Sequence, residues 1–213
     1  ATAGEDRNVI LWHTRDNAAP AMIGNPLQDH SGGVRVAALS PGGRMMVTAP
    51  VSGPAWLWTI DDPARSQARW KLEQGNYIGA VAFSPDGRLL ATGSDYKTVV
   101  LWNVSDPDHV TRYPNPLTGN TGGITALRFS PDGRTLRSAG YHTDLVEWDV
   151  TDPERPRETG KNLLNASALF ADFSPDGRVL VAGRSVEGEP DGGLVLRDVG
   201  DLGDVRELGT IGD

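Results

Sequence analysis

The chain has 213 residues, which is enough for one or two domains with a substantial core. Its formal net charge is −8, and no run of Lys or Arg provides the basic footprint of a nucleic-acid-binding protein. It has no cysteine, which excludes disulfides and thiolate metal sites, and no apolar run of membrane-spanning length. We therefore expect neither a nucleic acid nor a membrane as partner.

The first part of the chain contains one late strand and then a complete strand–turn–strand unit. Ala1 to Trp12 ends in the apolar run NVILW, and the Asn-, Ala- and Pro-containing segment from Thr14 to Pro26 is predicted to be a linker. A strand is expected from Val34 to Leu39, followed by the turn Ser40-Pro41-Gly42-Gly43 and, later, by the strand Ala55-Trp56-Leu57-Trp58.

The second unit is the most regular one. An apolar strand ends at Phe83, and the chain reverses at Ser84-Pro85-Asp86-Gly87. Pro presets φ, Asp bonds to its own backbone, and Gly accepts the positive φ of a tight turn. The strand Thr98 to Trp102 is apolar at consecutive residues and rich in β-branched side chains, which predicts a strand covered on both faces.

The same phrase recurs along the chain at a nearly fixed period. The turns SPGG, SPDG, SPDG and SPDG begin at Ser40, Ser84, Ser130 and Ser174, which are 44, 46 and 44 residues apart. Each unit closes with a strand that ends in Trp (12, 58, 102 and 148), except that the last unit has Arg197. A period in the mid-forties with four short strands per unit is typical of a propeller built from repeated blades.

We therefore predict an all-β fold, a β-propeller of four-stranded antiparallel blades. Its boundaries are expected at 1–29 (half-blade and linker), 30–73, 74–119, 120–163 and 164–213, or about four and a half blades. A ring of seven blades needs about 300 residues, so we expect an open arc rather than a closed ring, cut from a longer protein. The apolar faces at both ends of such an arc favour self-association. The outer strands are expected at Arg69–Leu72 and, less regularly, at Arg157–Thr159.

The motif FSPDG…LW[ND]V resembles the WD-repeat family over essentially the whole chain. The resemblance implies a buried hydrogen-bonded set in each blade, made of His, Ser or Thr, Asp and Trp. By position, the successive sets are Asp6 and Trp12; His30, Thr48, Ser52 and Trp58; Gln74, Thr92, Tyr96 and Trp102; Asn120, Ser138, His142 and Trp148; and Leu164, Ala182, Asp191 and Arg197. No set is complete, and we expect the surviving members to be structural.

The resemblance also implies a binding face at the end of the axis where strands two and three are joined. The residues that this places there are Arg35, Tyr77, Asp95, Tyr96, Tyr141, His142, Glu187 and Glu189. The last two belong to a turn between Arg184 and Leu194 that is longer than its counterpart in the second unit, and we expect it to project as an acidic tip. The alternatives are that the tyrosines only pack over the blade edge and that the longer turn has no function.

No motif for catalysis or for a cofactor is present. The chain has four histidines, spread over different units without metal-ligand spacing, and it lacks a GxSxG elbow, a P-loop and a pair of catalytic carboxylates. We therefore expect no enzyme, no cofactor and no metal, but a protein-interaction scaffold or sensor, and a cytoplasmic location. The resemblance implies a place in a larger bacterial regulatory or signalling protein. The alternative is a periplasmic propeller like those of the Tol system, or the propeller cap of a peptidase.

One blade carries charges where the others are apolar. Glu147 replaces a Leu before the strand-three Trp, Arg137 stands where Val47 and Ala91 stand in other units, and Arg128 replaces an alanine of the first strand. A lone buried carboxylate costs several kcal/mol, so charges at facing positions predict compensation. We predict a salt bridge between Glu147 and Arg137, with Arg128 as the alternative partner.

Overall fold

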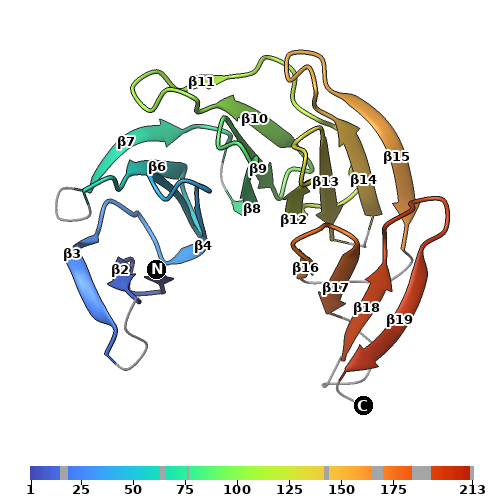
Figure 1. Ribbon diagram of the computed structural model, residues 1–213, viewed down its shortest axis with the longest axis horizontal. Coiled ribbons are helices and arrows are strands. Elements are labelled where there is room, and N and C mark those ends of the chain that lie inside the picture. The colour runs from blue at the N-terminus through green and yellow to red at the C-terminus, as the bar shows by residue number, and fades with distance from the viewer. Residues whose placement is uncertain are drawn as a thin grey trace.

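The computed structural model describes residues 1–14, 19–62, 66–75, 77–141, 144–164, 170–183 and 193–211. Within these residues the chain is all-β and forms five antiparallel sheets. Figure 1 shows the sheets following one another around an open arc, with the two termini at its two ends. The predicted open propeller is thereby confirmed.

The first sheet contains more of a blade than the sequence indicated. Its three strands, in the order β1-β2-β3, are β1 (Thr2–Ala3), β2 (Val9–His13) and β3 (Ala21–Leu27). The prediction of a linker from Thr14 to Pro26 was therefore wrong in part. β3 pairs with β2 around a β-bulge between Val9 and Leu11, so an irregular strand can still supply the outer edge.

The other four sheets have four strands each. The second comprises β4 (Val34–Leu39), β5 (Met45–Pro50), β6 (Ala55–Thr59) and β7 (Gln67–Leu72), and the third β8 (Ile78–Phe83), β9 (Leu89–Ser94), β10 (Val99–Asn103) and β11 (Thr111–Arg112). The fourth comprises β12 (Ile124–Phe129), β13 (Thr135–Gly140), β14 (Asp144–Asp149) and β15 (Arg157–Leu163), and the fifth β16 (Ala171–Phe173), β17 (Val179–Gly183), β18 (Leu194–Asp198) and β19 (Arg206–Ile211). Both expected outer strands are present, in β7 and β15.

The repeated turns have the chemistry that their residues predict. In the second unit the Gly87 N–H donates to the Ser84 carbonyl at 2.9 Å, and Gly87 has a φ of 70°. Asp86 Oδ1 accepts bonds from the Ser84 hydroxyl at 2.5 Å and from the Arg88 N–H at 3.0 Å. The carboxylate is therefore used inside the turn, as expected.

The core lies between consecutive sheets rather than inside any one of them. Val47 and Leu57 of the second sheet pack with Leu90 and Val100 of the third, and all four side chains are at most 1% exposed. Each fully buried side chain of this size contributes about 1.5–3 kcal/mol. Stacking of neighbouring blades therefore supplies most of the apolar burial.

The junction between the fourth and fifth sheets is polar at one row. The predicted pairing is confirmed, because Arg137 Nη2 lies 2.7 Å from Glu147 Oε2, with the two side chains 15% and 22% exposed. Arg128, the alternative partner, instead donates to the Pro175 carbonyl, at 2.6 Å from Nη2. Both arginines thus bind the fifth sheet.

Candidate functional site

The second sheet holds a buried set built on Thr48. The Trp58 indole N–H donates to Thr48 Oγ1 at 2.7 Å, and His30 Nε2 lies 2.7 Å from the same oxygen. His30 Nδ1 lies 3.2 Å from the Arg7 carbonyl of the first sheet, and a carbonyl oxygen can only accept. Nδ1 therefore carries the proton, and Nε2 accepts the Thr48 hydroxyl. Burial lowers the pKa of His30, which favours this neutral form.

The third sheet replaces the histidine by Gln74. The Thr92 hydroxyl donates to Gln74 Oε1, while the Trp102 indole donates to Thr92 Oγ1 at 2.8 Å. Gln74 Nε2 donates to the Thr98 carbonyl at 3.1 Å. Tyr96, which the resemblance placed in this set, is 64% exposed and does not take part.

The fourth sheet has a carboxylate that the sequence reading missed. Ser138 donates to Asn120 Oδ1 at 2.6 Å, and the Trp148 indole donates to Ser138 Oγ at 3.0 Å. Asp144, which is fully buried, accepts from the Thr121 N–H and, at 3.4 Å, from Asn120 Nδ2. His142, predicted for this role, lies outside the described residues. The sequence signal that could have revealed Asp144 is an Asp at the first position of an apolar strand. Thr98 occupies the same position in the preceding unit.

The two terminal sheets are variations on the same arrangement. The Trp12 indole donates to Thr2 Oγ1 at 2.9 Å, so Thr2 is the hydroxyl member that the sequence reading left out. Arg197, in place of Trp, donates to the Leu164 carbonyl at 2.9 Å. Asp191 lies outside the described residues. In each described sheet these groups are paired within the protein, as expected of structural residues.

Part of the predicted binding face comes together at one end of the axis. Arg35 Nη2, on β4 of the second sheet, lies 3.2 Å from the Tyr141 hydroxyl, which follows β13 of the fourth sheet. This hydrogen bond therefore connects the second sheet to the fourth, past the third sheet that lies between them in the arc. A Cβ at Gly123 would lie 2.7 Å from Asp95 Cα and 3.1 Å from Tyr141 Cδ2, so Asp95 and Tyr141 both border this glycine.

Two more tyrosines of this face are exposed. Tyr77 is 45% and Tyr96 64% exposed, and the Asp95 N–H donates to the Tyr77 carbonyl at 3.0 Å. Tyr77 has a φ of 63°, a strained conformation for a bulky residue, and such conformations cluster at functional sites. Within the described part of the chain Asp95 Oδ1 is buried without a hydrogen-bond partner. We call Arg35, Tyr77, Asp95, Tyr96 and Tyr141 the axial cluster.

His142, Glu187 and Glu189 lie outside the described residues, as does most of the longer turn. The opposite end of the axis has a hollow of about 510 Å³, lined in part by the turn prolines Pro41, Pro85, Pro131 and Pro175, and no axial-cluster residue borders it.

Two other features are absent from the described ranges. These ranges contain no group of three or more His, Asp or Glu side chains arranged to hold a metal ion. They also contain no helix of the length and apolarity needed to cross a membrane.

Comparison with known proteins identifies two repeats. Residues 69–103 and 112–149 match the family model described as WD domain, G-beta repeat. These segments include β8 to β10 and β12 to β14, and therefore the Trp102 and Trp148 strands. No curated protein matches the chain.

Proposed function

The chain belongs to the WD-repeat family, and on that premise we propose that it is a non-catalytic platform that binds a protein through the axial cluster. WD repeats generally mediate protein–protein interaction or scaffolding. The finer proposal is that this chain does so as the sensor or regulatory part of a cytoplasmic protein.

The observation that carries the proposal is the Arg35–Tyr141 hydrogen bond over the axis. It joins side chains from two sheets into one surface, beside two exposed tyrosines, of which Tyr77 lies just before β8 and Tyr96 in the turn between β9 and β10. Tyr and Arg are enriched among residues that dominate binding energy, because they offer large contact areas and directed hydrogen bonds. Recognition also concentrates in loops held by a rigid scaffold.

The test uses the purified chain as bait in a lysate of its source cells, followed by affinity measurement with each captured protein. We expect the double variant Arg35→Ala/Tyr96→Ala to weaken a genuine partner by at least about tenfold, since truncating a hot spot costs about 2 kcal/mol or more. The matched control is Leu39→Ala, which removes a 49%-exposed side chain from the other end of β4. If every captured protein binds the double variant as tightly as it binds the Leu39→Ala control, the proposal is wrong.

We also propose that two copies associate through the open faces of the arc. The support is exposed apolar side chains on the terminal sheets, namely Met22 on β3 and Leu208 and Ile211 on β19, which are 52–58% exposed. Sedimentation equilibrium tests this: a concentration-dependent dimer supports it, and a monomer throughout the accessible range contradicts it.

A further inference from the structure

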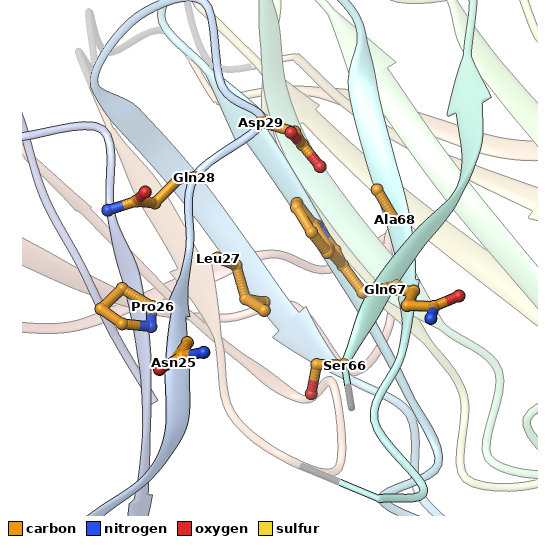
Figure 2. A pocket seen from close by; sticks show the side chains of 9 residues that line it. Asn25, Pro26, Leu27, Gln28, Asp29, Ser66, Gln67 and Ala68 are labelled. Atoms are coloured by element: carbon orange, nitrogen blue, oxygen red, sulfur yellow. The ribbon is translucent and has the colours of Figure 1, made fainter. Parts of the chain in front are cut away.

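A cleft of about 480 Å³ opens on the rim of the arc between the first two sheets. Figure 2 shows it between β3 and β7, with Asn25, Leu27 and Asp29 on one wall and Ser66 and Ala68 on the other. The carboxylate of Asp29 points across towards Ala68, while Gln28 points away. Asp29 is the only charged residue that lines the cleft in the described part of the chain.

The repeat supplies an internal comparison, because the same stretch recurs between the third and fourth sheets. Pro26-Leu27-Gln28-Asp29 corresponds to Pro116-Leu117-Thr118-Gly119, and Ala68 opposite Trp58 corresponds to Glu158 opposite Trp148. At that second place the chain fills its own groove. A Cβ on Gly119 would lie 2.6 Å from Glu158 Oε2 and 2.8 Å from the edge of the Trp148 ring.

The filled groove also shows which groups such a place binds. The Lys161 ammonium donates to the Gly119 carbonyl and lies 3.9 Å from Asp144 Oδ2. Asn115 Nδ2 donates to the main-chain carbonyl of Glu154 at 2.7 Å. This part of the repeat therefore binds two kinds of group, namely a cation and a main-chain carbonyl.

The cleft between the first two sheets lacks both partners. The residue that corresponds to Lys161 is Lys71, and its ammonium lies 3.3 Å from Glu73. Asn25, which corresponds to Asn115, makes no side-chain hydrogen bond among the described residues. Ala68 is smaller than Glu158, so the space that the Glu158 side chain fills in the other groove is open in this cleft. The carboxylate of this cleft belongs to Asp29, on the wall opposite Ala68.

We propose that this cleft binds an extended segment of a partner polypeptide, with a lysine side chain of that segment against Asp29 and a main-chain carbonyl accepting from the Asn25 amide. Asp29 would supply the negative charge that faces the lysine ammonium. Leu27 and Ala68 would supply the apolar floor and wall of the cleft. The site is separate from the axial cluster and does not depend on it.

The probe is the peptide acetyl-Gly-Gly-Lys-Gly-Gly-amide, titrated into the isotopically labelled full chain and followed by NMR. We expect shifts of the Asn25 side-chain amide and of the Leu27 and Ala68 main-chain amides. The peptide with glutamine in place of lysine should bind at least about tenfold more weakly, because it leaves the Asp29 carboxylate without a counter-charge.

Two variants and one control define the site. Asp29→Asn, which removes only charge, and Ala68→Gln, which fills the space without charge, should each weaken the lysine peptide by at least about tenfold. Asp201→Asn removes an exposed carboxylate of the fifth-sheet region and should change the affinity less than about twofold. Shifts outside the cleft, equal binding of both peptides, unchanged binding by Asp29→Asn or Ala68→Gln, or no shift at millimolar peptide would each overturn the proposal. The dispersion of the variant spectra shows that the fold is retained.

Discussion

Arg137 and Glu147 stand directly opposite each other on β13 and β14, in the register that Val47 and Leu57 occupy in the second sheet. One blade has therefore exchanged an apolar cross-strand pair for an ion pair. The guanidinium is also bound by the fifth sheet, since Nη1 donates to the carbonyls of Gly177 at 2.8 Å and Val199 at 2.7 Å. The pair consequently connects two blades as well as two strands.

Replacing Arg137 by Ala should destabilise the chain by about 3 kcal/mol, because a half-buried carboxylate loses its partner and two carbonyls lose a charged donor. The double variant Arg137→Val/Glu147→Leu, which copies the second sheet, should lose less than Arg137→Ala because it leaves no unpaired charge. Urea unfolding measures both. A loss below about 1 kcal/mol for the single variant would mean that the pair behaves as an exposed one.

The features that sequence reasoning predicted correctly are those fixed by local chemistry and period. The turns at Ser84 and Ser130 were predictable because Pro, Asp and Gly each have one suitable position in a tight turn. The Arg137–Glu147 pair was predictable because antiparallel register follows once two strands and one shared face are assigned.

The features that it missed depend on geometry between units. The segment that contains β3 was predicted to be a linker because of its Asn, Ala and Pro residues, yet the pairing of β3 with β2 tolerates a bulge. The Arg35–Tyr141 contact joins residues 106 positions apart, and its formation depends on how three sheets are arranged. Asp144 was missed because the carboxylate has moved two positions from His142, where the family pattern expects it.

Asp144→Ala should destabilise the chain by about 2–4 kcal/mol, because the Thr121 N–H and the Asn120 amide lose a charged acceptor in a buried place. Asp144→Asn should cost less, since an amide oxygen can still accept from the Thr121 N–H. Lys161→Met should also cost less than Asp144→Ala, as the carboxylate keeps its other partners. Thermal unfolding compares the three, and a loss below about 1 kcal/mol for Asp144→Ala would contradict the assigned role.

The stability of the chain should fall as the pH is lowered through the range in which His30 titrates. Burial holds the pKa of His30 in the folded protein below its ordinary value of 6.5. Between the folded-state pKa and about 6.5 the unfolded chain binds more protons, and stability therefore rises with pH in that interval.

The matched variant is His30→Asn, since the fourth sheet has Asn120 at this position. It should remove this part of the pH dependence of urea unfolding between pH 8 and pH 5, whereas His13→Asn, on an exposed side chain, should keep it. Parallel pH profiles for the His30→Asn variant and the unmodified chain would show that His30 is not responsible.

Gly79→Ala should destabilise the chain by about 3 kcal/mol, because an added methyl group would overlap the Ile124 carbonyl oxygen at the contact between β8 and β12. Backbone on both sides leaves no flexible side chain to move aside. The control is Gly42→Ala, whose added Cβ has its nearest neighbour, Arg44 Cγ, 3.9 Å away. Both changes reduce the entropy of the unfolded chain to a similar extent, so the difference between their urea-unfolding free energies isolates the clash in the folded state. Equal free energies of unfolding would show that the third and fourth sheets can separate at this contact without cost.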